Sequence, residues 1–545
     1  MTAPCNIAAA LPRLAAEAPA RIAMHCPGPR GDYAMSLSYG ELDARSDAIA
    51  AGLARRGIVR GTRTVLMVRP TPEFFLLMFA LFKAGAVPVL VDPGIDRRAL
   101  RQCLDEAQPE AFIGIPLAQF ARVLLGWAKS ARVRVTTGRR ALLADATLAQ
   151  VERDGAGAGP QLSDTAPDDV AAILFTSGST GVPKGVVYRH RHFVAQIAML
   201  RDAFGIAGGG VDFPTFPPFA LFDPALGLTS IIPDMDPTRP AQADPVKLHA
   251  AIARFGVDQL FGSPALMRVL ADHGAPLPTV RRVTSAGAPV PPEVVARMLE
   301  LLPDEASFWT PYGATECLPV AVIEGRELLS LRERTEQGAG TCVGRPVAPN
   351  QVRIIRIGDE AIAQWSDELL VAPGEVGEIT VAGPSATDAY FNREAQTRLA
   401  KIEERGEHGV RTVHRMGDVG WFDGDGRLWF CGRKSHRVET ADGPLYTEQV
   451  EPVFNVHPEV RRTALVGIGA AGAQRPVLCV ETVAGTGAAQ HARIAQELRA
   501  LGARFAHTAR IDRIVFHPKF PVDIRHNAKI GRESLARWAA RRSQA

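Results

Sequence analysis

The sequence is poor in the features that mark disulfide scaffolds, zinc proteins and membrane proteins. Its seven cysteines are scattered, no Cys-x-x-Cys occurs, and no His/Cys cluster has zinc-ligand spacing. The most apolar run, Phe74 to Phe82, stops at Lys83 and is too short to cross a bilayer. The first residues lack the charged-then-apolar form of a signal peptide. We therefore expect free thiols, no transmembrane segment and a cytoplasmic protein.

Charge does not point to a nucleic-acid partner either. The formal net charge is +4 over 545 residues, whereas nucleic-acid binding usually requires a concentrated basic face. We therefore expect no nucleic acid among the partners. The length exceeds what one hydrophobic core can organise and predicts roughly two to four folding units.

Apolar segments of strand length alternate with helical segments through the first part of the chain. An apolar helix is predicted at residues 73–84. Buried strands are predicted at 64–68, 87–91, 171–175, 257–261 and 280–283. Such alternation favours α/β layers around a largely parallel sheet.

The pattern changes near Gly344. Strand patterns joined by turns follow at 352–356, 377–383 and 428–430, and mixed strand and helix patterns begin near Arg433. We therefore predict an α/β protein whose N-terminal domain spans residues 1–432 and includes a β-rich subdomain over about 344–430. A smaller α+β domain over 433–545 should follow.

The strand predicted at 171–175 runs into a loop of glycines, hydroxyl residues and a lysine. Glycine lets backbone N–H groups approach phosphate oxygens, hydroxyls donate further hydrogen bonds, and lysine supplies a point charge. The loop is not a Walker A motif, because no Gly-Lys-[Ser/Thr] ending follows at the required spacing. We predict that a phosphate group is bound by Thr176, Ser177, Gly178, Ser179, Thr180, Gly181 and Lys184.

The ten-residue order of this loop, 176–185, resembles the phosphate-binding loop of the adenylate-forming superfamily. That superfamily includes acyl-CoA synthetases, peptide-synthetase adenylation domains and luciferases. The resemblance implies a large N-terminal domain of two α/β subdomains plus a β-rich subdomain, followed by a small mobile α+β C-terminal domain. It also implies that the enzyme uses ATP and Mg²⁺ to activate a carboxylic acid as an acyl-adenylate.

Two further motifs of the superfamily follow in order. The segment 285–289 resembles the loop that lies against adenine and contributes Gly287, Ala288 and Pro289. The segment 312–316 resembles the aromatic-Gly-x-Thr-Glu motif and includes Gly313. By that resemblance Tyr312 would stack on adenine, Thr315 would touch the α-phosphate and Glu316 would hold Mg²⁺. An aromatic ring, a hydroxyl and a hard carboxylate suit these roles.

The late motifs complete the series. Residues 416–418 resemble the Thr-Gly-Asp motif, in which Asp418 would accept hydrogen bonds from both ribose hydroxyls. Arg433 follows a glycine as in the Gly-Arg of the domain hinge, near ribose and phosphate. Lys529 falls where the superfamily keeps a catalytic lysine that serves the adenylation step.

Two motifs depart from the superfamily pattern. The hinge usually carries a charged residue two positions after its arginine, and Ser435 stands there instead. The segment from Pro521 to Lys529 is two residues longer than usual. Together with segments 216–223 and 316–319, these departures resemble one branch of the superfamily, the β-lactone synthetases of bacterial long-chain olefin biosynthesis.

Membership in that branch implies a specific reaction. The substrate would be a β-hydroxy acid with two long alkyl chains, a 2-alkyl-3-hydroxy acid. After activation as acyl-AMP, its own hydroxyl would attack the activated carbonyl, close a β-lactone and release AMP, an intramolecular step that proximity favours. The resemblance also leaves room for an assembly with the other enzymes of the olefin pathway.

Further residues near the motifs are candidates for the acyl pocket and for proton transfer. His190 is a candidate for contact with substrate or pyrophosphate, or a packed histidine, and His192 and His436 are candidate bases for the hydroxyl. Cys317 is interpreted as a small pocket or core residue. Apolar side chains that suit an acyl pocket or a plain core are Phe213, Phe216, Phe219, Leu221, Phe222 and Leu226.

Two other functions stay open at this point. A fatty acyl-CoA synthetase would make a thioester when CoA is supplied. A non-catalytic homologue would bind nucleotide or an acyl chain without chemistry, but the complete loop together with Glu316, Asp418 and Arg433 argues against it.

Overall fold

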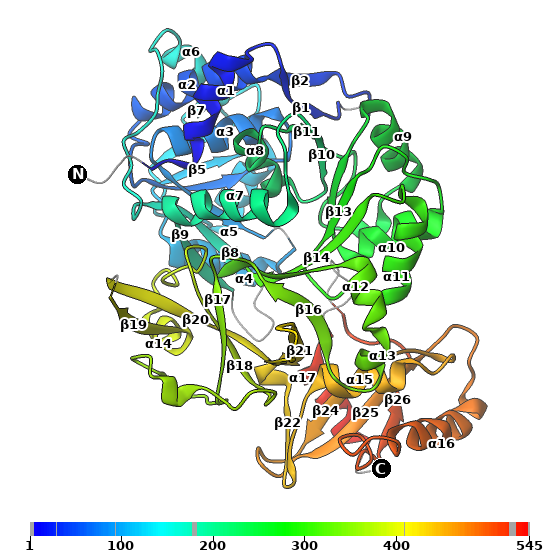
Figure 1. Cartoon of the computed structure of the whole chain (residues 1–545). Coiled ribbons are helices and arrows are strands. Elements are labelled where there is room, and N and C mark those ends of the chain that lie inside the picture. Colours follow the sequence, from blue (N-terminus) through cyan, green and yellow to red (C-terminus); the bar gives the residue numbers. More distant parts are fainter. Residues whose placement is uncertain are drawn as a thin grey trace.

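A computed structural model of the chain describes residues 5–28, 30–92, 94–176, 183–407, 409–522 and 530–542. Several predicted site residues lie outside these ranges, namely Ser177, Gly178, Ser179, Thr180, Gly181 and Lys529. Figure 1 shows a large body of α/β layers with a smaller C-terminal unit, coloured orange to red, below it.

A seven-stranded sheet forms the first α/β layer, in the order β7-β6-β5-β3-β4-β8-β9. All neighbours are parallel except β8 and β9, which confirms the predicted parallel character. The strands are β3 (Arg63–Met67), β4 (Val87–Val91), β5 (Ala111–Gly114), β6 (Val133–Thr136), β7 (Ala146–Thr147), β8 (Val170–Thr176) and β9 (Lys184–Arg189).

The predicted apolar helix is α3 (Pro72–Lys83), and it lies in the core beside α2 (Tyr39–Ala54). Every side chain from Phe74 to Lys83 is buried. The ammonium of Lys83 lies 2.6 Å from a carboxylate oxygen of Asp43 and 2.6 Å from one of Asp47. Among the described residues, no helix combines the length and the apolar character that a membrane span requires.

A fourteen-stranded sheet forms the second layer and continues into the β-rich region. Its parallel centre contains β10 (Val211–Pro214), β12 (Gln259–Gly262), β13 (Arg282–Ser285) and β14 (Ser307–Ala314). Its antiparallel part contains β15 (Cys317–Glu324), β16 (Thr341–Pro346), β17 (Gln351–Ile355), β18 (Gly377–Ala382), β20 (Gly409–Phe422) and β21 (Leu428–Arg433). The predicted β-rich region is therefore continuous with the α/β sheet through β15 and β16.

The C-terminal unit has a sheet and a core of its own. The sheet contains β24 (Val460–Ile468), β25 (Arg475–Thr482) and β26 (Ile514–Phe516). The helices around it are α15 (Thr447–Asn455), α16 (His491–Gly502) and α17 (Arg532–Arg541). The small hairpin β22 (Val438–Thr440) and β23 (Gly443–Leu445) leads into it. The predicted α/β class is confirmed, and the division at residue 432 stays a prediction.

Candidate active site

One cavity of about 2110 Å³ is lined by strands of both large sheets, by α7 (His190–Phe204) and by residues 433–435. Ligand pockets typically measure about 300–1,000 Å³. This cavity is therefore large enough to hold a nucleotide together with a second, bulky substrate.

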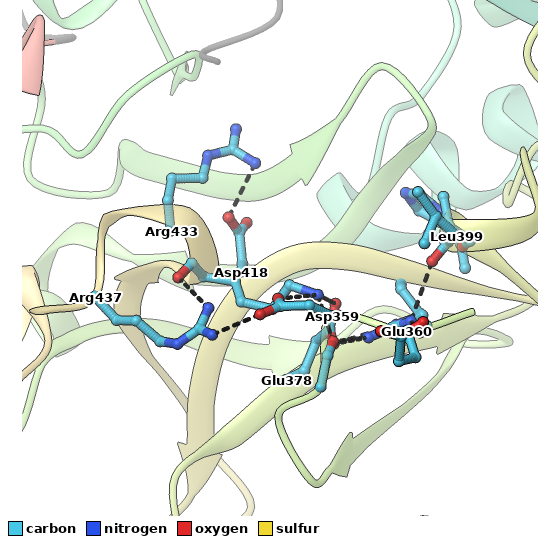
Figure 2. A network of polar contacts seen from close by, with 12 residues as sticks. Asp359, Glu360, Glu378, Leu399, Asp418, Arg433 and Arg437 are labelled. Carbon is cyan, nitrogen blue, oxygen red and sulfur yellow. Dashed lines mark hydrogen bonds and ion pairs between the residues drawn. The ribbon is translucent and has the colours of Figure 1, made fainter. Parts of the chain in front are cut away.

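Two predicted nucleotide ligands, Tyr312 and Arg433, line one end of this cavity, and the predicted ribose ligand Asp418 contacts both from outside the described lining. The hydroxyl of Tyr312 on β14 donates to Oδ2 of Asp418 on β20 over 2.6 Å. Nη1 of Arg433 on β21 lies 3.0 Å from Oδ1 of the same carboxylate. Asp418 and Arg433 are direct cross-strand partners, so their side chains share one face of the sheet. Figure 2 shows the Arg433 side chain directed at Asp418.

The electrostatics of this group leave an acceptor free for a ligand. Burial raises the pKa of Asp418 above the usual range, while the Arg433 guanidinium opposes that shift. Burial, then the Asp418 charge, raise the pKa of Tyr312, so its hydroxyl stays protonated and donates. Oδ1 of Asp418 is buried and receives no hydrogen bond of good geometry in the described part of the chain. A ribose hydroxyl is the kind of donor that such an atom needs.

The Thr315–Glu316 turn between β14 and β15 is held from three sides. The hydroxyl of Tyr390 donates to Oε1 of Glu316 over 2.7 Å. The backbone N–H and the hydroxyl of Thr387 both donate to the Glu316 carbonyl over 2.9 Å. The Tyr188 hydroxyl donates to the Thr315 carbonyl. These bonds fix the turn at the cavity wall.

The Glu316 carboxylate fits a magnesium ion. It lines the cavity, and no lysine or arginine of the described residues forms an ion pair with it. Its one described side-chain partner is the neutral hydroxyl of Tyr390. A hard carboxylate oxygen that lines a cavity without a direct ion-pair partner is the kind of ligand that Mg²⁺ prefers.

No sequence motif marks the residues that hold this turn. Tyr188, Thr387 and Tyr390 belong to no motif that local spacing could mark. One signal was present, because the chain has only six tyrosines, and three of them, Tyr188, Tyr312 and Tyr390, line the cavity. A scarce aromatic residue type with a polar end is concentrated where polar ligands must be bound.

Positive groups surround the same end of the cavity. Nζ of Lys184, a predicted phosphate ligand, lies 4.8 Å from the centre of the Tyr390 ring. Lys401 lies behind that ring, at 5.8 Å. His414, which no motif singled out, also lines the cavity, but it adds no positive charge, because burial and the nearby Lys401 lower its pKa well below the usual value. Such a cationic end suits the phosphates of a nucleotide.

Lys401 is buried, with 9% of its surface exposed. Its ammonium donates to the backbone carbonyl of Thr387 and lies 3.3 Å from the hydroxyl of that residue. Burial lowers the pKa of Lys401 to about 8, against the opposing attraction of Glu316. The side chain thus supports Thr387, which in turn holds Glu316.

The lowered pKa of Lys401 predicts a pH-dependent stability. Between pH 8 and about 10.5 the folded chain has released this proton while the unfolded chain keeps it, so stability rises with pH. We expect the unfolding free energy of the wild type, minus that of Lys401→Met, to rise by about 2 kcal/mol from pH 7.5 to pH 9.5. Urea unfolding of both proteins in matched buffers measures this difference, and a flat or falling difference would contradict the assignment.

Some of the predicted adenine and acyl-pocket residues line the cavity, and others do not. Gly287 lines the cavity directly after β13 with a φ of +101°, a conformation that glycine adopts without strain. Ala288 and Pro289 follow it outside the described lining, and Phe213 packs in the core of the second layer. The residues that do line the cavity are Gly313, Phe216, Phe219, Leu221, Phe222 and Leu226.

The structure does not bring the predicted histidines to the described cavity lining. Nδ1 of His190 accepts from the backbone N–H of Ile7 over 3.2 Å, and burial lowers its pKa to about 4. Nδ1 of His192 accepts from the backbone N–H of Arg189 over 3.0 Å. Burial also lowers the pKa of His436 to about 4. Cys317 is fully buried, with Sγ 3.4 Å from the Ser385 hydroxyl, as in a core.

The hinge segment is clamped to the β-rich region by charge, as Figure 2 shows. Nζ of Lys434 lies 3.2 Å from Glu378, whose carboxylate also pairs with the buried Arg415 at 2.5 Å. Arg437 pairs with Asp359 at 2.9 Å. Ser435 stands where the superfamily usually has a charged residue, and Lys434 and Arg437 supply charges before and after it.

Gly432 lets the small unit approach this clamp closely. Its φ is +124°, and a Cβ at this position would lie 2.3 Å from the hydroxyl oxygen of Thr447 on α15. Only glycine fits both the backbone conformation and the contact. The Gly432–Arg433 pair therefore joins the nucleotide end of the cavity to the first helix of the C-terminal unit.

Known proteins share the sequence pattern and the fold of this chain. The AMP-binding enzyme family matches residues 11–391. The olefin beta-lactone synthetase of Xanthomonas campestris pv. campestris is 72% identical over 99% of this chain and 98% of its own length. That of Stenotrophomonas maltophilia is 69% identical over 99% of both chains. Among solved structures, the amide bond synthetase McbA from Marinactinospora thermotolerans matches with a TM-score of 0.77 and 23% identity, over 98% of this chain and 99% of its own. The chain therefore belongs to the AMP-binding enzyme family.

Proposed function

We propose that this chain is an ATP-dependent olefin β-lactone synthetase, an AMP-forming ligase. Its substrate is a 2-alkyl-3-hydroxy acid with two long alkyl chains. The observation that carries the proposal is the near-full-length similarity to two olefin beta-lactone synthetases. The size of the cavity and its mixture of a cationic end with phenylalanine and leucine side chains support the same substrate.

The first step joins the acid to AMP. A carboxylate oxygen of the substrate attacks the α-phosphorus of ATP, and the bond to pyrophosphate breaks. Both reactants are anions, so the site must neutralise them and hold them in line. Lys184 and the loop before it, with Lys529, would bind the phosphates, while Asp418 and Arg433 would fix the ribose. Mg²⁺, held by Glu316, supplies further positive charge at the phosphates.

The second step closes the ring. The β-hydroxyl oxygen attacks the activated carbonyl carbon, the bond from that carbon to the AMP oxygen breaks, and the hydroxyl proton is released. Because nucleophile and electrophile belong to one molecule, the step needs orientation more than a second binding site. Tyr390 and Thr387 contribute by holding the Glu316 turn, and the apolar walls keep water from the reactive acyl-AMP.

Product analysis tests this function. Purified protein is incubated with MgATP and a long-chain 2-alkyl-3-hydroxy acid, with and without CoA, and the products are followed by NMR and mass spectrometry. We expect a β-lactone and AMP in equal amounts, regardless of CoA. A matched 2-alkyl acid without the hydroxyl should form acyl-AMP and no lactone. A thioester that forms only with CoA would instead make the chain an acyl-CoA ligase.

A further inference from the structure

Helix α5 (Pro116–Leu125) carries large apolar side chains on its exposed side as well as on its inner side. Its polar Gln119 is fully buried and donates to the backbone carbonyl of Val135 over 2.9 Å. Ala118, Ala121 and Leu125 pack against the core, whereas other apolar side chains of the helix are exposed, Leu117 by 67%, Phe120 by 54% and Leu124 by 69%. The spacing of three and four residues places these side chains on one face of the helix.

The segment 139–143 extends this apolar face. The guanidinium of Arg122 donates to the Leu143 carbonyl over 2.9 Å and to Gln119, and so holds the segment beside the helix. Leu142 is exposed by 70% and Leu143 by 48%. We call the exposed apolar residues of α5 together with Leu142 and Leu143 the α5 face. Contiguous exposed apolar side chains of this kind mark interaction sites on soluble proteins.

The chain segment that carries the α5 face is basic. Between Ala111 and Ala144 the sequence has six arginines or lysines and no aspartate or glutamate. Arg134 is paired with Asp145. The cations that are exposed and form no ion pair within the described chain are Lys129, Arg132, Arg139 and Arg140.

We propose that the α5 face docks on the surface of an anionic lipid bilayer. Leucine and phenylalanine side chains beside arginines are the composition that inserts at the boundary of headgroups and acyl chains. A second copy of the same face fits poorly, because two-fold symmetry would bring the cations of both copies together. An acidic protein partner is the competing occupant, and the experiment separates it from lipid.

The position of α5 next to the large cavity suggests why the enzyme would bind a membrane at this face. Ile115 and Ala118, on either side of the exposed Leu117, line the large cavity. One side of the helix thus borders the cavity and the other would border the membrane. This use rests on the proposed function, since an acid with two long alkyl chains and its lactone product partition into lipid.

Vesicle flotation tests the proposal with the full-length protein. The probes are vesicles of phosphatidylcholine with phosphatidylglycerol, and vesicles of phosphatidylcholine alone. We expect the protein to float with the anionic vesicles at low salt and to be released by high salt. The triple variant Leu117→Gln/Phe120→Gln/Leu124→Gln should float about tenfold less, and Arg139→Gln/Arg140→Gln should lose the preference for anionic lipid.

The control is Val246→Gln/Val410→Gln, which removes two apolar side chains that are exposed to a similar degree, 63% and 67%. It should float like the wild type. The proposal is overturned if the wild type floats with neither kind of vesicle, or if the triple variant floats like the control. A triple variant that alters only the oligomeric state or the capture of an acidic protein overturns it as well. Adenylate formation with a short, soluble acid should be unchanged, so failure of docking and failure of the proposed function are distinguishable.

Discussion

An Asp418→Asn substitution is expected to lower the rate of adenylate formation by about 10²–10⁴. The carboxylate would accept two hydrogen bonds from ribose, and a hydrogen bond to a charged group contributes about 1.5–3 kcal/mol. At 1.36 kcal/mol for each factor of ten, two such bonds give this range. The measurement is kcat/KM for ATP in ATP–pyrophosphate exchange with a fixed acid concentration.

The controls separate binding from folding. Tyr312→Phe keeps the ring and removes the hydroxyl that donates to Asp418, so we expect a loss of tenfold or less. Asp425→Asn changes a 65% exposed carboxylate that pairs with Arg427 and should change nothing. A thermal melt of each variant shows whether it is folded. An Asp418→Asn enzyme that is folded and retains more than a tenth of the activity would mean that the carboxylate only anchors Arg433.

A Lys83→Met substitution is expected to lower the free energy of unfolding by about 3–5 kcal/mol. The Lys83 side chain is fully buried and its ammonium lies between two carboxylates. Removing it leaves Asp43 and Asp47 in a low-dielectric environment without a counterion and close to each other. The first transition in urea unfolding, followed by tryptophan fluorescence, measures the change.

The matched control removes the orphaned charges. Lys83→Met combined with Asp43→Asn and Asp47→Asn keeps the shape of the cluster without any net charge. We expect this triple variant to recover a large part of the lost stability, because the cost arises from unpaired carboxylates and not from the missing lysine. If the triple variant is no more stable than the single one, the loss is due to packing around the lysine stem.

The strands that the sequence predicted best are those bounded by polar or turn residues. The strand predicted at 87–91 matches β4 in full. The strands predicted from Val257 and Val280 begin two residues later, at Gln259 and Arg282. Both valines are buried, but their N–H groups close the preceding turns onto Ile252 and Leu277. Burial therefore starts before strand pairing, and an apolar pattern reports burial and not hydrogen bonding.

The residues of the candidate site were also predictable only in part from the sequence. Tyr312, Asp418 and Arg433 were identified one by one from local motifs, and the fold brings them together across more than 100 residues. Local motifs could not reveal Tyr390, because its value lies in a contact with Glu316 that only the tertiary structure creates. They also could not show that His190 is buried outside the described cavity lining, where its Nδ1 accepts from the backbone N–H of Ile7. A motif gives a side chain its chemistry but not its direction.

The ion pairs at the predicted hinge also mark the point where the chain leaves the β-rich region. Arg433, Lys434 and Arg437 are all tied to the β-rich region, through Asp418, Glu378 and Asp359. The very next residue, Val438, is 2% exposed and belongs to the hydrophobic core of the C-terminal unit. The chain thus passes from contacts with the β-rich region to the core of the C-terminal unit across a single peptide link. A rotation of the small unit, which the family resemblance implies, would leave the ion pairs of Arg433, Lys434 and Arg437 in place if it occurred at that link.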